Sequence, residues 1–150
     1  MASLSRKTNA QTMECLQKIF LAEMAGVLRY LHYSFMVMGH HRIPIQGWFR
    51  AQADEAKTHA IAIGEKITSY GGHPPLLSNK VEESNVHTLS QMLEESMGFE
   101  EAGLALYADL VSLAASQNDM ALEEWARGMV VEEQDHLDEV RKMLRDPNRH

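Results

Sequence analysis

Hydrophobic residues recur along this chain at intervals of three, four and seven positions, and polar residues fill the positions between them. Such intervals place apolar side chains on one face of an α-helix rather than on a β-strand. The pattern predicts four helices, at about residues 8–39, 45–70, 87–116 and 119–145. We therefore predict an all-α fold in a single domain that spans residues 1–150.

Residues typical of helix ends separate these segments. Capping boxes are expected at two helix starts, at Thr8 with Gln11 and at Thr88 with Gln91. Gly39 to Pro44 interrupts the pattern after the first helix, and Asn118 or Asp119 is expected to cap the fourth. The links between the first and second helices, and between the third and fourth, are therefore short.

The link between the second and third helices is long. Gly71-Gly72 ends the second helix, and His73-Pro74-Pro75 cannot continue it. About 15 residues separate these glycines from the third helix, whereas most helix–helix connections have about 2–8. A short, a long and a short link are typical of an antiparallel four-helix bundle with one long crossover between helices 2 and 3.

Composition narrows the class of protein. The 14 basic and 21 acidic residues give a net charge of −7, so we expect no nucleic-acid partner. No apolar run approaches the roughly 18 residues of a membrane span, and the first residues lack the apolar stretch of a secretory signal. The only cysteine, Cys15, cannot form an intrachain disulfide, which fits a reducing compartment. We expect a cytoplasmic protein without a membrane partner.

The two halves of the chain resemble each other. A shift of 77 residues, without gaps, aligns the segment Glu23–Tyr30 with Glu100–Tyr107, and four of the eight positions are identical. The same shift aligns Trp48 with Trp125, Arg50 with Arg127, Glu55 with Glu132 and His59 with His136. Two amphipathic hairpins could share an apolar pattern by necessity, but here scarce and polar residues also match. The repeat predicts a bundle of two related helical hairpins.

The repeated polar residues are expected to lie in the bundle core. Glu23 and Glu100 have largely apolar neighbours, and Tyr30 and Tyr107 return to the same helical faces seven positions later. A lone buried carboxylate is costly, so it must be paired, protonated or bound to metal. A glutamate three or four positions before His59 or His136 can reach the same centre as the histidine. Oxygen-rich sites with some imidazole favour iron or manganese.

These residues resemble the ferritin-like superfamily, and bacterioferritin most closely, over roughly residues 10–145. In that family the first and third helices each supply one glutamate, and the second and fourth each supply a Glu-x-x-His pair. Glu133-Gln-Asp-His136 matches the fourth-helix pair, and Glu23 and Glu100 each lie 36 residues before a histidine. The resemblance implies two iron ions per chain, with manganese as the alternative metal. Its implied metal ligands are Glu23, Glu55, His59, Glu100, Glu133 and His136.

The resemblance also implies separate roles for these residues. Glu23 and Glu100 would be terminal ligands, Glu133 and Glu55 the bridging pair, and each histidine would bind one metal. Tyr30 matches the family's tyrosine beside the metal site, which makes it the candidate catalytic residue. It could hydrogen-bond a ligand or donate an electron, or it could be a core tyrosine that satisfies a carboxylate.

The second helix departs from the family pattern. Glu55 lies four residues before His59, and Ala56 stands at the usual spacing of three. Glu55 could reach the metal from the other side of the histidine, a π-bulge could restore the register, or the site could be lopsided. Glu132, the repeat partner of Glu55, is either a reserve ligand or a solvated acid.

Two further family features are missing. The bacterioferritin haem methionine would fall at Ala56 or Lys57, so we predict no haem. Only fourteen residues follow His136, and we expect no fifth helix of the kind that helps to close a bacterioferritin cage. We expect a homo-oligomer, at least a dimer, whose size stays open.

The leading hypothesis is a ferroxidase-type protein that oxidises Fe(II) with oxygen or hydrogen peroxide, for iron storage or detoxification. The alternatives are a rubrerythrin-like peroxide-reducing enzyme and a non-catalytic interaction protein with a degenerate metal site. His32 and His87 show no spacing signal, and Glu82-Glu83 is interpreted as a solvated acidic pair.

Overall fold

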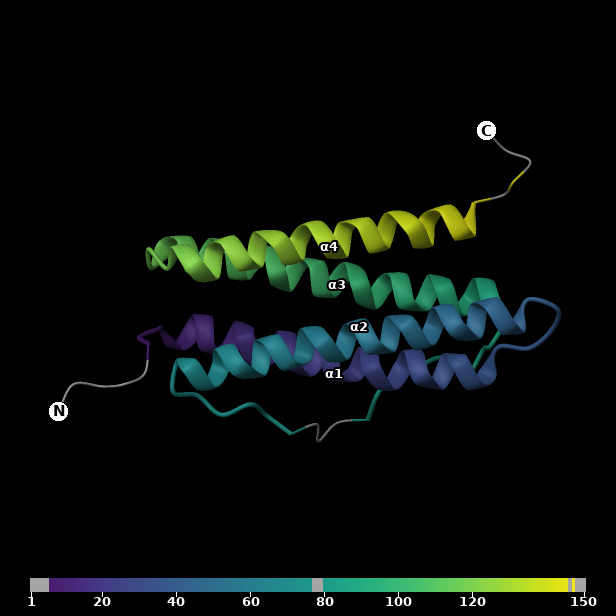
Figure 1. Cartoon of the computed structure of the whole chain (residues 1–150), viewed down its shortest axis with the longest axis horizontal. Helices are drawn as coiled ribbons and strands as arrows, with labels where there is room; N and C mark the ends of the chain where they lie inside the picture. Colours follow the sequence, from purple (N-terminus) through teal and green to yellow (C-terminus); the bar gives the residue numbers. More distant parts are fainter. Residues whose placement is uncertain (1–5, 77–79, 146, 148–150) are drawn as a thin grey trace.

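The computed structural model describes residues 6–76, 80–145 and 147. Four α-helices are the only regular secondary structure in these residues, which confirms the all-α prediction (Figure 1). They are α1 (Ala10–Met36), α2 (Arg42–Ser69), α3 (Leu89–Ser116) and α4 (Met120–Leu144). The outermost residues of the predicted domain, 1–5 and 148–150, lie outside the described residues.

The helices form two antiparallel hairpins. α1 packs against α2, α3 packs against α4, and α1 also packs against α3. The connection from α2 to α3 runs from one end of the bundle to the other, so these two helices point the same way (Figure 1). This arrangement confirms the predicted four-helix bundle with a single long crossover.

Side-chain caps begin three of the helices. The Asn9 side chain accepts a hydrogen bond from the Thr12 N–H (2.8 Å), and the Thr88 hydroxyl accepts one from the Gln91 N–H (3.2 Å). Asp119 caps α4 in the same way. The cap predicted at Thr8 is therefore wrong by one residue, because asparagine is the stronger cap and its own N–H bonds the Gln117 side chain.

The turn between α1 and α2 lies about three residues earlier in the chain than expected. α1 ends at Met36 rather than near Gly39, because the Arg42 guanidinium donates to the carbonyl oxygens of Val37 (2.6 Å) and Phe35 (3.2 Å). α2 begins at Arg42, a few residues before the expected start. Pro44 then lies in the first helical turn, where no backbone N–H is required.

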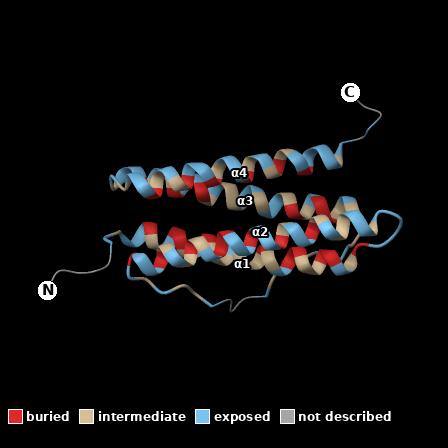
Figure 2. Ribbon diagram, in the orientation of Figure 1, coloured by how far each residue is buried: buried red, intermediate tan, exposed pale blue. Residues whose placement is uncertain are grey.

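Buried residues line the inward faces of the helices (Figure 2) and form two apolar clusters. One is built around Leu16, Ile63, Leu110 and Leu122, and the other around Tyr33, Phe49, Met92 and Val140. Glu23 lies between these clusters in sequence, so the polar residues of α1 interrupt the core at its middle. Within the described residues, no helix combines the length and apolarity that crossing a bilayer requires.

Asp119 joins three parts of the chain at one end of the bundle. Its carboxylate accepts the Leu122 N–H (3.2 Å), pairs with the Arg6 guanidinium (2.6 Å) and accepts the Tyr70 hydroxyl. Burial alone would raise the pKa of Asp119, but hydrogen bonds from Tyr70 and Leu122 outweigh it and lower the pKa. The ionised carboxylate therefore stabilises the folded chain.

Replacing Asp119 with alanine should lower the free energy of unfolding by about 1–2 kcal/mol at pH 7, because the cap and the ion pair are both lost. The pKa of Asp119 is lower in the folded chain than in the unfolded one. Its contribution is therefore complete above about pH 4 and is lost as the pH falls through the lowered pKa. Urea unfolding at pH 7 and pH 3 measures this difference.

The matched control is Asp109→Ala, an exposed aspartate within α3. It should change stability by less than about 0.5 kcal/mol. Equal effects of the two substitutions at pH 7 would contradict a stabilising role for Asp119.

Candidate metal centre

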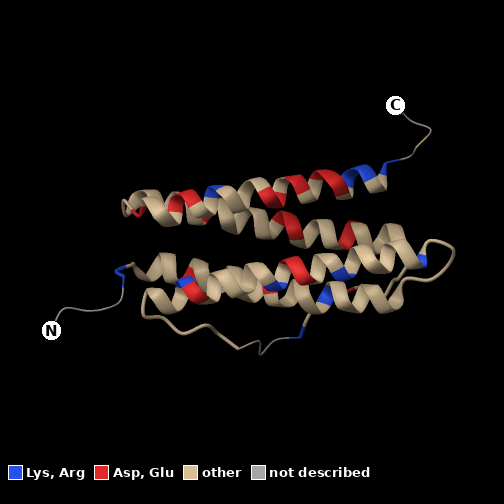
Figure 3. Cartoon of the chain, in the orientation of Figure 1, with Lys and Arg blue, Asp and Glu red and all other residues tan. Residues whose placement is uncertain are grey.

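Three carboxylates and two histidines meet in the middle of the bundle. Glu23 comes from α1, Glu100 from α3 and Glu133 from α4, and their side chains are only 12%, 20% and 7% exposed. Figure 3 shows acidic segments in the middle of α2, α3 and α4. All five residues line one cavity of about 20 Å³, together with Tyr30, Gln52, Glu55 and Ala56. The cavity has room for about one water molecule or an ion.

His59 lies at the centre of the first half of this site, between two carboxylates. Its Nδ1 lies 3.4 Å from Oε1 of Glu23 and 3.5 Å from Oε1 of Glu133. The donor atoms of these three residues all lie within 4.8 Å of one another, which is close enough for them to be candidate ligands of a single metal ion. One carboxylate from α1, one from α4 and an imidazole from α2 are therefore already grouped.

His136 and Glu100 form the second half, which is more open. Nε2 of His136 lies 3.8 Å from Oε1 of Glu100, and the Tyr30 hydroxyl lies between them. This hydroxyl donates to Glu100 (2.7 Å) and is 3.2 Å from Nε2 of His136. The Trp48 ring stacks on His136 at 5.8 Å and an angle of 9°, which holds the imidazole plane.

Glu133 lies between the two halves. Its Oε1 lies 3.5 Å from Nδ1 of His59 on one side, and on the other side it lies near enough to Glu100 to raise the pKa of that carboxyl. Burial and the nearby Glu133 raise the pKa of Glu100 to about 8. Burial lowers the pKa of His59, but the hydrogen bonds with Glu133 and Glu23 outweigh it and raise that pKa to about 11. A proton on Glu100 and a proton on His59 thus reduce the clustered negative charge.

Two tyrosines donate hydrogen bonds to the carboxylates of Glu23 and Glu100, each to the helix opposite its own. Tyr30 on α1 donates to Glu100 on α3, and Tyr107 on α3 donates to Glu23 on α1, both at 2.7 Å. Burial, followed by the neighbouring glutamates, raises the pKa of both phenols far above their usual value. Both hydroxyls therefore remain protonated donors. This crossed pairing is the structural counterpart of the 77-residue repeat.

Glu55 lies on the other side of His59. α2 is a regular α-helix through this segment, without the π-bulge considered from the sequence. Oε1 of Glu55 is 3.9 Å from Nε2 of His59, and Oε2 of Glu132 is 3.0 Å from the same nitrogen. These carboxylates are 47% and 56% exposed. Glu55 therefore belongs to a second, outer group with Glu132 and not to the group of Glu23 and Glu133.

Ala56 occupies the position where a second bridging glutamate is expected. Ala56 is buried and faces Gly26 of α1. A side-chain Cβ at position 26 would lie 3.5 Å from the Cβ of Ala56. The inner site thus has three carboxylates and two imidazoles, and among the residues that the structure describes no lysine or arginine lines the cavity. This donor set fits Fe(II) or Mn(II), which prefer oxygen ligands with some imidazole.

Gln52 lines the cavity but was not predicted as a site residue. It lies seven positions before His59, so both side chains project from the same face of α2. That spacing was visible in the sequence, but an uncharged amide gave no reason to select it. The stacking of Trp48 on His136 depends on contacts between α2 and α4 that local sequence does not contain.

Three solved structures share this fold over almost the whole chain. A ferritin-like, diiron-carboxylate protein from Bacillus anthracis has a TM-score of 0.85 at 24% identity, covering 90% of this chain and 96% of its own. A bacterioferritin from Rhodobacter capsulatus has a TM-score of 0.80 at 19% identity, covering 93% and 86%. A ferritin from Chlorobium tepidum has a TM-score of 0.81 at 20% identity, covering 91% and 83%.

Sequence comparison agrees with this likeness. A nutrient stress-induced DNA-binding protein from Synechococcus is 24% identical over 149 residues, which cover 94% of this chain and 85% of that protein. A family model described as the ferritin-like domain matches residues 13–149. This match covers nearly the whole chain, and the shared fold covers 90% of it in the Bacillus anthracis structure. The protein therefore belongs to the ferritin-like family.

Proposed function

We propose that this protein binds two Fe(II) ions per chain in the bundle centre and oxidises them with oxygen or hydrogen peroxide. The observation that carries the proposal is the position of Glu133, buried between a Glu23/His59 group and a Glu100/His136 group. Each group offers one carboxylate and one imidazole, and Glu133 is available to both. Mn(II) is the alternative metal for the same ligands.

The proposed chemistry uses the iron ions as substrates. Each Fe(II) loses one electron and becomes Fe(III). Together they supply the two electrons that reduce O₂ and two protons to H₂O₂, or H₂O₂ and two protons to two water molecules. Paired oxidation limits the release of one-electron oxygen radicals, and the carboxylates favour the more highly charged ferric product. Glu23 and Glu100 serve as terminal ligands, and His59 and His136 bind one ion each.

The outer group supplies a route to this centre. Glu55 and Glu132 are about half exposed, and their donor atoms lie within 4.8 Å of one another and of His59. Solvent-exposed carboxylates on a chain of net charge −7 attract Fe(II). We therefore assign Glu55 to iron capture beside His59, where it still acts as a metal ligand, and leave bridging to Glu133.

Assembly, location and partners complete the proposal. Leu28 and Phe35 are 48% and 56% exposed, and their spacing of seven places both on one face of α1. Such an apolar face favours burial against a second copy, which supports a homo-oligomer of at least two chains. A cytoplasmic location without a nucleic-acid or membrane partner, and the absence of haem, remain proposals.

Anaerobic loading with Fe(II) tests the proposal. Two Fe(II) per chain should bind and be oxidised when oxygen or peroxide is added, as measured by metal analysis and ferric absorbance. Glu133→Gln should slow oxidation by roughly tenfold or more, because the ligand shared by both ions loses its charge. Glu124→Gln, an exposed position on the same helix, should match the unsubstituted chain.

The result also separates the alternatives. Iron uptake far beyond two ions per chain indicates storage, whereas repeated peroxide consumption without ferric accumulation indicates a rubrerythrin-like peroxide-reducing enzyme. Absence of iron binding, or equal oxidation rates in Glu133→Gln and Glu124→Gln, would contradict the proposed metal centre and favour the interaction-protein hypothesis.

Ala56→Glu should strengthen the site. In the repeat Ala56 aligns with Glu133, and it lines the same cavity, so a glutamate there adds the missing carboxylate. We expect the second Mn(II) to bind roughly tenfold more tightly in calorimetry. The metal-free variant should unfold at a lower temperature because a fourth carboxylate is buried near the other three.

The control is Ala51→Glu, an exposed position on α2. It makes the same chemical change away from the cavity and should leave Mn(II) affinity unaltered. A common response of both variants would show that general negative charge, and not a ligand at position 56, determines the affinity.

Tyr30 and Tyr107 form a matched pair for testing the proposed catalytic role of Tyr30. Each donates to a terminal glutamate at 2.7 Å, but Tyr30 also lies 3.2 Å from His136. Tyr30→Phe should slow iron oxidation more than Tyr107→Phe and should remove any tyrosyl radical seen by electron paramagnetic resonance during the reaction. Equal slowing, with the radical retained in both variants, would reduce Tyr30 to a positioning residue.

A further inference from the structure

A second group of metal-ligand side chains lies on the outside of the bundle. It consists of His32 on α1, Glu83 in the crossover, and His87, which lies two residues before α3. Nε2 of His32 is 2.6 Å from Oε1 of Glu83, and Nε2 of His87 is 3.1 Å from the same oxygen. None of these three residues belongs to the Glu23 and Glu133 centre.

The group has the spacing of a mononuclear site. Its three donor atoms lie within 4.8 Å of one another, and the two imidazole rings meet edge to face at 5.4 Å. Glu83 and His87 are largely buried, at 13% and 19% exposed, whereas His32 is 41% exposed. A bound ion would therefore have two nitrogen ligands and one oxygen ligand, with its remaining positions open to water.

Backbone geometry directs the Glu83 carboxylate towards the histidines. Oε2 of Glu83 accepts the N–H of Asn85 at 2.7 Å, which leaves Oε1 for His32 and His87. Asn85 has φ +61°, a left-handed conformation that asparagine tolerates better than most residues. This second hydrogen bond orients the carboxylate as outer hydrogen bonds orient ligands in established metal sites.

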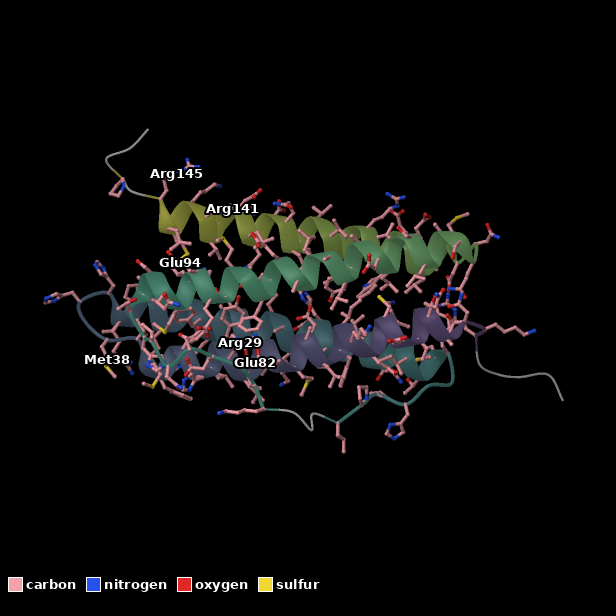
Figure 4. The ribbon with its side chains drawn as sticks, turned by 180° about the vertical axis from the view of Figure 1, so that it is seen from behind. Arg29, Met38, Glu82, Glu94, Arg141 and Arg145 are labelled. Carbon is pink, nitrogen blue, oxygen red and sulfur yellow. The ribbon has the colours of Figure 1, made fainter. Side chains whose placement is uncertain are left out.

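Other contacts hold the crossover segment in place. The Arg29 guanidinium donates from Nε to the Glu82 carbonyl (3.3 Å), and these residues lie next to each other in Figure 4. The Glu95 carboxylate accepts the Ser84 N–H (2.9 Å) and the Tyr33 hydroxyl (2.6 Å). Glu83 is therefore anchored on both sides, to α1 and to α3, before any ion binds.

We propose that His32, Glu83 and His87 bind one divalent transition-metal ion, such as Zn(II) or Fe(II), and thereby join α1, the crossover and the start of α3. Imidazole ligands with a single carboxylate suit Zn(II) and Fe(II) better than Mg(II) or Ca(II), which prefer all-oxygen sites. The site does not depend on the proposed iron oxidation, because it shares no ligand with the inner centre.

Zinc binding to the full chain tests this inference. Equilibrium dialysis should show one Zn(II) fewer per chain in Glu83→Gln and His87→Asn than in the unsubstituted protein. At limiting Zn(II), the affinity of the His32, Glu83 and His87 site for Zn(II) should fall by roughly tenfold or more in these two variants. His73→Asn, an exposed histidine in the same crossover, should bind as many ions as the unsubstituted chain.

Two further measurements distinguish zinc binding at this site from binding at the inner centre and from loss of folding. Zn(II) should raise the unfolding temperature of Glu133→Gln, whose inner centre is impaired, and this rise should be absent when His87→Asn is added. Circular dichroism of the metal-free variants establishes that each is folded. Equal zinc stoichiometry in His73→Asn, His87→Asn and Glu83→Gln would overturn the proposal, whatever the outcome at the inner centre.

Discussion

The structure depends on three carboxylates that are buried together in the middle of an otherwise apolar bundle. Glu23, Glu100 and Glu133 come from three different helices, and within the described part of the chain no lysine or arginine lines their cavity. Such a group is unfavourable unless protons or metal ions balance its charge. The raised pKa of Glu100 and the crossed hydrogen bonds from Tyr30 and Tyr107 reduce the cost of burying this group. The apolar clusters on either side stabilise the fold, and the polar centre is where we place the proposed iron chemistry.

Much of this arrangement could be predicted from the sequence because its determinants are local or repeated. Helical spacing gave four helices, the long segment after Gly71-Gly72 gave the crossover, and the shift of 77 residues paired Glu23 with Glu100 and His59 with His136. Glu23 has apolar neighbours in the middle of α1, and its side chain is 12% exposed. The structure brings together Glu23, His59, Glu100, Glu133 and His136 around one cavity.

The remaining features depend on distances between helices, which local patterns do not contain. Glu55 is one residue out of register, and only the packed structure places it with Glu132 beside Nε2 of His59. His32 and Glu83 are 51 residues apart and meet because the crossover returns along α1. Their sequence spacing therefore carried no signal, and Glu83 was interpreted as a solvated acid. The start of α2 was also misplaced, because its His41 cap makes no side-chain hydrogen bond.

The central claim is that Glu133 lies between two metal ions despite the alanine at position 56. The most direct measurement is anomalous X-ray diffraction from crystals soaked in Mn(II), whose oxidation state is stable during data collection. The account predicts two anomalous peaks within the bundle, one beside Glu23 and His59 and one beside Glu100 and His136, both in contact with Glu133. Peaks confined to Glu55 and Glu132 on the outer side of His59, or no peak between the helices, would contradict it.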